Sequence, residues 1–199
     1  MGTWTVGASR RDEAAEAGEA LSHAMRTNPN HVAVWGEDER ARRRQQALMT
    51  GILAGTRPAD VLVARSDGRI VGVLRMVDAT RCQLSTRQQL RMLPGILATQ
   101  KGSTGRLLGW LRTWSRHDPD EAHWHLGPVG VLPDRQGGGV GSALMEAFVA
   151  RVDDDGSAAY LETDKPENVG FYERFGFETT GEDQVHGVDN WFMWRAARP

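Results

Sequence analysis

QGGGVG, at residues 136–141, is a glycine-rich stretch between an apolar run over 124–132 and a helical pattern that begins near Ser142. Glycine has no Cβ, so closely spaced glycines can adopt positive φ angles and curl into a concave nest of backbone N–H groups. The start of the following helix adds a partial positive charge at the same place. The stretch therefore predicts a phosphate-binding loop, although glycine is also the usual residue of a plain strand-to-helix turn.

Two common phosphate loops do not fit this stretch. A P-loop needs a lysine followed by serine or threonine, whereas this loop ends in Gly141 and Ser142 without a lysine. The dinucleotide fingerprint G-x-G-x-x-G begins with Gly137 and Gly139, but Ser142 stands where its third glycine should be. The pattern that remains is Q-x-x-G-x-G, formed by Gln136, Gly139 and Gly141.

The length and composition fit one domain. The chain has 199 residues, with 24 basic and 26 acidic side chains and a formal net charge of −2. This balance provides no general attraction to nucleic acid or to an anionic membrane, so neither is expected as a partner. Cys82 is the only cysteine, and we find neither a leader sequence nor about 18 consecutive apolar residues. We expect a cytoplasmic protein, as a monomer or a homodimer.

The periodicity of apolar residues predicts a mixed α/β chain. An Asp67-Gly68 turn between two β-rich runs is a strong hairpin signal. The long segment 78–120 contains two helical patterns and is interpreted as a helical insertion, and 28–30 (Asn-Pro-Asn) should break a helix. Strands are expected at 4–6, 60–65, 69–77, 123–132, 157–163, 177–185 and 189–194, and helices at 11–25, 37–53, 85–98, 107–114, from 142 onward and at 168–175.

Motifs after and before the loop point to one family. Val129-Gly130-Val131 precedes the loop, Leu161-Glu162-Thr163 forms the next predicted strand, and Asn168 is followed by FYERFGF at 171–177. Together with Q-x-x-G-x-G, these motifs resemble the GNAT acetyltransferase superfamily. The resemblance is firm over 123–196, and the chain length and the insertion resemble the puromycin N-acetyltransferase branch.

The resemblance implies a GNAT-type α/β fold over 1–199. This fold is a mixed, mostly antiparallel twisted sheet of about seven strands flanked by helices, with a V-shaped splay between two central strands and the 78–120 insertion before the cofactor-binding strand. Acetyl-CoA is expected in the splay as co-substrate, held by strand backbone at its pantetheine and by the glycine loop at its pyrophosphate. The expected cofactor-binding residues are Val129, Gly130, Val131, Gln136, Gly137, Gly138, Gly139, Val140, Gly141, Ser142 and Asn168.

Three side chains are candidates for the chemistry of acetyl transfer. Tyr172 is the leading candidate to protonate the departing thiolate, because in similar enzymes the tyrosine at this place lies near the cofactor sulfur, although this ring could instead only pack a short helix. Glu162 could accept the proton of the amine or only orient the cationic amine. His123 and His125 alternate along a strand and share one face, where His125 is a candidate base and His123 a candidate substrate-binding residue. Both could equally be plain polar residues on an exposed face.

A metal site was weighed for the same histidines. Six histidines are present, and only His123 and His125 have ligand-like spacing. A zinc site needs at least three protein ligands, and no motif near this pair supplies the third. The sequence therefore predicts no metal.

The acceptor side is expected to involve 28–39 and the insertion. Trp35 and Trp110 could line an aromatic acceptor pocket, whereas the helical spacing of Trp114 favours core packing. Because the insertion could cap the site, we expect a primary amine on a small molecule as acceptor, with an aminoacyl-type antibiotic as one candidate, and direct attack in a ternary complex. The alternatives are a protein or peptide N-acetyltransferase and a CoA-binding regulatory module without catalysis.

Overall fold

The computed structural model describes residues 3–78 and 94–198. The strands are β1 (Thr5–Ala8), β2 (Val61–Ser66), β3 (Arg69–Val77), β4 (His123–Val131), β5 (Ala158–Thr163), β6 (Glu178–Val185) and β7 (Val188–Arg195). The helices are α1 (Ala14–Ala24), α2 (Pro29–Trp35), α3 (Glu39–Ala54), α5 (Thr104–Ser115), α6 (Val140–Asp154) and α7 (Pro166–Glu173), and short 3-10 turns lie at η1 (Arg11–Glu13), η2 (Pro58–Asp60) and η3 (Pro133–Arg135). Among the helices in this part of the chain, none combines the length and apolar character of a membrane span.

All seven strands belong to one sheet in the order β1-β2-β3-β4-β5-β7-β6. Only β4 and β5 run parallel, and every other neighbouring pair is antiparallel. The predicted β2–β3 hairpin is confirmed, with both turn residues in the left-handed region at φ 51° for Asp67 and 76° for Gly68. The predicted mixed, mostly antiparallel seven-stranded sheet is therefore confirmed.

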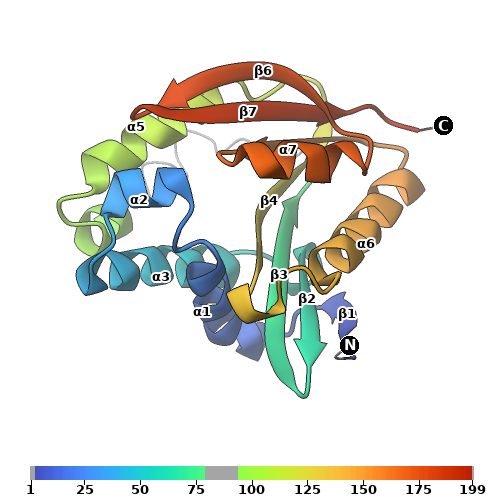
Figure 1. Ribbon diagram of the computed structural model, residues 1–199, viewed down its shortest axis with the longest axis horizontal. Coiled ribbons are helices and arrows are strands. Elements are labelled where there is room, and N and C mark those ends of the chain that lie inside the picture. Colours follow the sequence, from blue (N-terminus) through green and yellow to red (C-terminus); the bar gives the residue numbers. More distant parts are fainter. Residues whose placement is uncertain (1–2, 79–93, 199) are drawn as a thin grey trace.

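Helices cover both faces of the sheet because side chains alternate along its central strands. Val63 and Val73 point to the face covered by α1 and α3, whereas Ala64 and Leu74 point to the face covered by α6. Figure 1 shows α1 and α3 on one side of β3 and α6 on the other. A third apolar cluster forms where α2 and α5 meet the end of β6, and this cluster matters for the site described next.

Helix α2 is absent from the prediction, which recognised only a helix break at residues 28–30. The break is real, because α1 ends at Ala24 and its cap is Met25. However, Pro29 is the first residue of a new helix, and Asn28 is its N-cap with extended backbone. Proline suits this position because the first N–H of a helix has no intrahelical partner. Of the helix predicted at 85–98, residues 85–93 lie outside the described residues, and residues 94–99 are helical.

Candidate functional site

Strands β4 and β5 separate halfway along β4. They pair from His123 to Leu126 of β4, opposite Ala158 to Leu161 of β5. Beyond this point residues 129–131 stay paired with β3 but no longer with β5. The expected V-shaped splay is thus present, and it leaves one backbone edge of β4 facing a groove of about 660 Å³.

This groove, called the β4–α6 groove below, collects most of the residues expected to bind the cofactor. Gly138 and Val140 are not among its lining residues, and the Val140 side chain is buried in the core with 3% exposure, so only its backbone can face a ligand. The expected residues that do line the groove are Val129, Gly130, Val131, Gln136, Gly137, Gly139, Gly141, Ser142 and Asn168.

One wall of the groove depends on a glycine in β4. A Cβ at Gly130 would lie 2.8 Å from the Cβ of Ala24 and 3.0 Å from Cδ2 of Leu21, both on α1. The missing side chain therefore allows α1 to pack directly on the strand. Ala24 and Met25 at the end of α1 line the groove as a result.

The glycine loop has the geometry of an anion nest at a helix start. Gly137 and Gly139 have φ angles of 72° and 88°, and Gly139 is the N-cap of α6. The carbonyl of Gly139 accepts the first helical hydrogen bond from the N–H of Ala143 at 3.0 Å. The preceding N–H groups of α6 have no partner one turn back in the helix, so they and the helix dipole favour an anion here. Gln136 anchors the loop by donating from Nε2 to the carbonyl of Val131 at 3.0 Å.

Basic side chains that the sequence motifs did not predict also line the groove. Arg135 follows β4, whereas Lys165 and Arg174 flank α7, and Glu167 is the acidic residue among the lining side chains. The Arg174 guanidinium lies 5.2 Å above the ring of Phe171. These residues are scattered in sequence, so no local pattern marks them. Their charge adds to the preference of the nest for an anion.

Tyr172 lies in the groove wall and is also packed in the core, so both readings of this residue agree with its position. Its ring contacts Phe171 and Phe177 edge-on, with centroids 5.3 and 6.2 Å away. Burial, together with the nearby Asp164 carboxylate, raises the pKa of the Tyr172 hydroxyl. The hydroxyl thus keeps its proton at neutral pH, as a proton donor must.

Asp164, directly after β5, is a site residue that sequence reasoning missed. Its carboxylate accepts from the N–H of Asn30 at 2.8 Å and from Nδ2 of Asn28 at 3.4 Å. Burial raises the pKa of this carboxyl group. These bonds attach the start of α2 to the end of β5, which positions α2 beside the groove.

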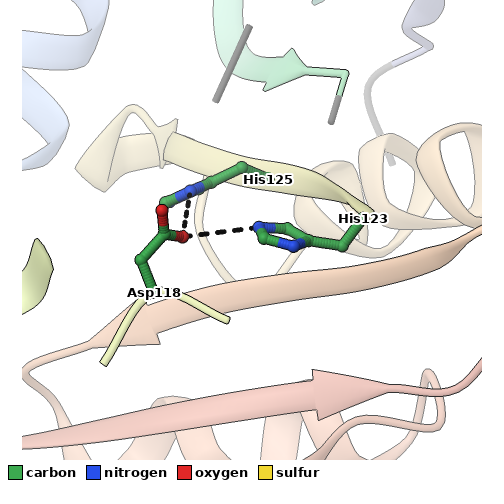
Figure 2. A group of neighbouring side chains, drawn as sticks. All are labelled: Asp118, His123 and His125. Atoms are coloured by element: carbon green, nitrogen blue, oxygen red, sulfur yellow. Dashed lines mark ion pairs between the residues drawn. The ribbon is translucent and has the colours of Figure 1, made fainter. Parts of the chain in front are cut away.

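The candidate base residues form a second group, called the Asp118 cluster, of Asp118, His123, His125 and Glu162. His125 Nε2 lies 2.9 Å from Oε2 of Glu162, whose side chain is 4% exposed. Figure 2 shows the Asp118 carboxylate facing both imidazoles, at 3.4 Å from His123 Nε2 and 3.7 Å from His125 Nδ1. The two histidines therefore share one strand face, as the alternation predicted.

Asp118 changes the interpretation of the histidine pair. Burial alone would raise the pKa of its carboxyl group, but hydrogen bonds from His123 and His125 outweigh this effect and leave the pKa below its ordinary value. The premise that no third ligand lies near the pair is wrong, because Asp118 stands five residues before His123 and the intervening turn folds it back. The spacing D-x4-H-x-H, formed by Asp118, His123 and His125, was the sequence signal that could have identified the third ligand.

Trp35 and Trp110 belong to a third group, called the tryptophan cluster, with His31 and Trp114. The His31 ring lies 5.1 Å from Trp35 and 5.2 Å from Trp110, and Trp110 contacts Trp114 at 5.0 Å. Trp35 and Trp110 are buried and do not line the β4–α6 groove, whereas Trp114 is only partly buried. The expectation that Trp114 packs as core is met only in part. The acceptor role of Trp35 and Trp110 stays a prediction.

The comparisons with known proteins agree with this architecture. Residues 79–177 match the model of the Acetyltransferase (GNAT) family. A mycothiol acetyltransferase from Paenarthrobacter aurescens is 34% identical over 88 residues, which are 42% of this chain and 27% of that protein. The chain thus spans less than a third of that relative's length. The finer resemblance to the puromycin N-acetyltransferase branch stays a prediction.

Solved structures match over the full chain. An acetyltransferase from Corynebacterium glutamicum, described as a histone acetyltransferase and related acetyltransferase, has a TM-score of 0.77 and 21% identity, covering 100% of this chain and 98% of that one. A GNAT family acetyltransferase from Brucella melitensis, solved in complex with acetyl-CoA, has a TM-score of 0.54 and 20% identity, covering 100% and 91%. The family model thus covers just under half of the chain, which resembles the acetyltransferase (GNAT) family over residues 79–177, and the solved structures share the fold of the full chain.

Proposed function

We propose that this chain is an acetyl-CoA-dependent N-acetyltransferase that acts on a primary amine of a small molecule by direct attack in a ternary complex. The observation that carries the proposal is the β4–α6 groove, where a backbone edge, an anion nest and a protonated tyrosine meet. Its volume of about 660 Å³ lies in the range of small-molecule sites.

The groove residues fit acetyl-CoA as co-substrate. The backbone of Val129 and Val131 would pair with the pantetheine amides, as a neighbouring strand would. The N–H groups of residues 137–142 would hold the pyrophosphate, and Arg135 and Lys165 line the same groove and would add charge. Asn168 donates from Nδ2 to Oγ1 of Thr163 at 3.2 Å, which fixes the start of α7 against β5.

The chemistry divides between two groups of residues. The amine nitrogen attacks the thioester carbonyl carbon, the N–C bond forms, and the C–S bond breaks. The His125–Glu162 pair takes the proton that leaves the amine, and the Tyr172 hydroxyl protonates the departing thiolate. His123 and the tryptophans Trp35 and Trp110 are assigned to the acceptor side, outside the groove that holds the donor.

A substrate panel tests this proposal. The purified chain is incubated with acetyl-CoA and a series of acceptors, and release of free thiol is measured. The panel contains simple primary amines, aminoacyl-type antibiotics and, because of the name of the curated relative, a mycothiol-related acceptor. We expect turnover with a small amine.

Other outcomes of the panel point to the alternatives. Acetylation of peptide N-termini or lysines without turnover of any small amine would replace the proposal with a protein or peptide acetyltransferase. Stabilisation by acetyl-CoA without any turnover, unchanged in Tyr172→Phe, would replace it with a non-catalytic CoA-binding module. The panel therefore separates all three functions.

A further inference from the structure

Three side chains of kinds that commonly bind metal ions converge at one point, and one of them is His125 of the proposed base. These are Oδ1 of Asp118, Nε2 of His123 and Nδ1 of His125, and the ligand atoms of the three residues all lie within 4.8 Å of one another. The Asp118 oxygen is 3.4 Å from the His123 nitrogen and 3.7 Å from the His125 nitrogen. A zinc ion with ligands about 2.1 Å away in a tetrahedron holds those ligands about 3.4 Å apart. The two distances from the Asp118 oxygen are close to this value.

The opposite nitrogen of each imidazole is bound to an oxygen that can only accept. Nδ1 of His123 lies 2.6 Å from the carbonyl oxygen of Glu121, and Nε2 of His125 lies 2.9 Å from Oε2 of Glu162. A carbonyl and an ionised carboxylate have no proton to give, so the imidazole nitrogens facing them carry N–H. The other nitrogen of each ring faces Asp118. It donates a hydrogen bond to the carboxylate while the imidazole is protonated, and its lone pair becomes available to a metal ion when that proton is lost.

This arrangement is the one that metal-binding histidines usually have. Ligand histidines donate their second N–H to a carboxylate or backbone carbonyl, which fixes the ring and its tautomer. The cluster supplies one acceptor of each kind, Glu162 for His125 and the Glu121 carbonyl for His123. Two imidazole nitrogens and a carboxylate oxygen thus converge on one position in the cluster.

We propose that Asp118, His123 and His125 form a binding site for a divalent first-row transition cation, with Zn²⁺ as its representative. The two nitrogen ligands favour such a cation over Mg²⁺ or Ca²⁺, which prefer oxygen. Three protein ligands leave a fourth coordination position open. The His123 side chain is 3% exposed, Asp118 12% and His125 21%, so solvent reaches the cluster from the His125 side.

The site has a consequence for catalysis that rests on the proposed function. A cation bound to Nδ1 of His125 occupies the lone pair that proton transfer would use. Zn²⁺ would therefore inhibit acetyl transfer through this cluster. Metal binding itself is independent of whether the chain transfers acetyl groups, so it is measured directly.

The test uses the whole chain without a histidine tag, freed of metal with a chelator. Co²⁺ is added while its visible ligand-field absorption is followed, and Zn²⁺ affinity is measured by competition with a chromophoric chelator. We expect one equivalent of either metal, with the intense Co²⁺ bands of a low-coordinate site. Asp118→Asn and His125→Gln should each weaken Zn²⁺ binding by about 100-fold or more, and Glu162→Gln by about 10-fold to 100-fold.

His117→Asn is the matched control, because the His117 side chain pairs with a different carboxylate, Asp183, at 3.0 Å. It should leave Zn²⁺ affinity within about twofold of the original, and circular dichroism checks that each variant is folded. Absence of stoichiometric binding, or binding that survives both Asp118→Asn and His125→Gln in folded protein, would overturn the proposal. The cluster would then be only a set of protonated imidazoles around a carboxylate.

Discussion

The β4–α6 groove and the Asp118 cluster would recognise their proposed ligands through different chemical groups, backbone in the first and side chains in the second. The groove presents mainly backbone, namely the free edge of β4 and the N–H groups at the start of α6. The cluster presents side chains from β4, β5 and the turn before β4. Backbone recognition depends on conformation, so glycines mark it in the sequence, whereas a side-chain cluster is created by folding and leaves a weaker mark.

Tyr172→Phe tests whether the hydroxyl group in the groove wall acts as the proton donor. The variant keeps the ring that packs against Phe171 and Phe177 and removes only the hydroxyl. We expect kcat to fall by about 100-fold to 1,000-fold, with the Kd for acetyl-CoA within about twofold of the original. Stopped-flow turnover and calorimetric binding measure the two quantities. Tyr172→Leu, which removes the ring as well as the hydroxyl, is the comparison variant. Equal turnover in the original chain and Tyr172→Phe would exclude the proton-donor role.

Gly139→Asp tests whether the backbone of the glycine loop binds acetyl-CoA. An aspartate here must adopt the φ of 88°, and its Cβ would lie 3.5 Å from the Trp4 ring, beside the proposed pyrophosphate. The strain of about 1–3 kcal/mol and the added negative charge should together weaken acetyl-CoA binding by about 100-fold. Binding is measured by calorimetry.

The other end of α6 offers the control. Gly156 also has a positive φ, 60°, and a Cβ there would meet nothing within 4 Å. Gly156→Asp should carry a similar conformational strain and leave acetyl-CoA affinity unchanged. If both variants bound acetyl-CoA as the original chain does, the loop would not be the pyrophosphate site.

The fold was predictable from sequence because its decisive signals are local. The Asp67-Gly68 turn defines the β2–β3 hairpin, and the glycine loop marks the junction of β4 and α6. Helix α2 was missed because Pro29 both ends one helix pattern and suits the first position of the next. Local sequence alone does not separate these two roles.

The side chains of the site were less predictable, for reasons of distance and burial. Asp164 contacts Asn30, 134 positions earlier in the chain, and no pattern in either segment announces the contact. Lys165 and Arg174 join Arg135 only after α7 folds over β5. Trp35 and Trp110 show the converse problem, since aromatic residues suit both a binding pocket and an apolar core.

Two variants, Glu162→Gln and His125→Gln, test whether these side chains act together as the base. If the two residues act as one unit, each single variant lowers kcat by about 10-fold to 100-fold, and the kcat of the double variant is little lower than that of either single variant. Acetyl-CoA affinity should stay within about twofold, because neither side chain lines the groove. Steady-state kinetics of all four chains measure this coupling. Fully multiplicative losses would show that the 2.9 Å contact is not used in catalysis.

The smallest effect concerns stability in the tryptophan cluster, where His31 is buried. Burial lowers the pKa of His31 from 6.5 to about 3, and Lys165 adds to the shift. Between pH 6.5 and 3, His31 is protonated in the unfolded chain and neutral in the folded chain. The stability of the folded state is therefore complete above pH 6.5 and is lost as the pH falls toward 3. The loss approaches about 1.4 kcal/mol per pH unit within this window.

Urea unfolding at pH 7.5 and 5.5 isolates this contribution. His31 accepts through Nδ1 from Nε2 of Gln45 at 2.5 Å, and His31→Asn can offer an amide oxygen in place of that nitrogen. The original chain should lose about 1 kcal/mol more than His31→Asn between the two pH values. His186→Asn, at an exposed position, should behave as the original chain does. An equal loss in His31→Asn would mean that His31 is protonated in the folded state and that the tryptophan cluster is open to water.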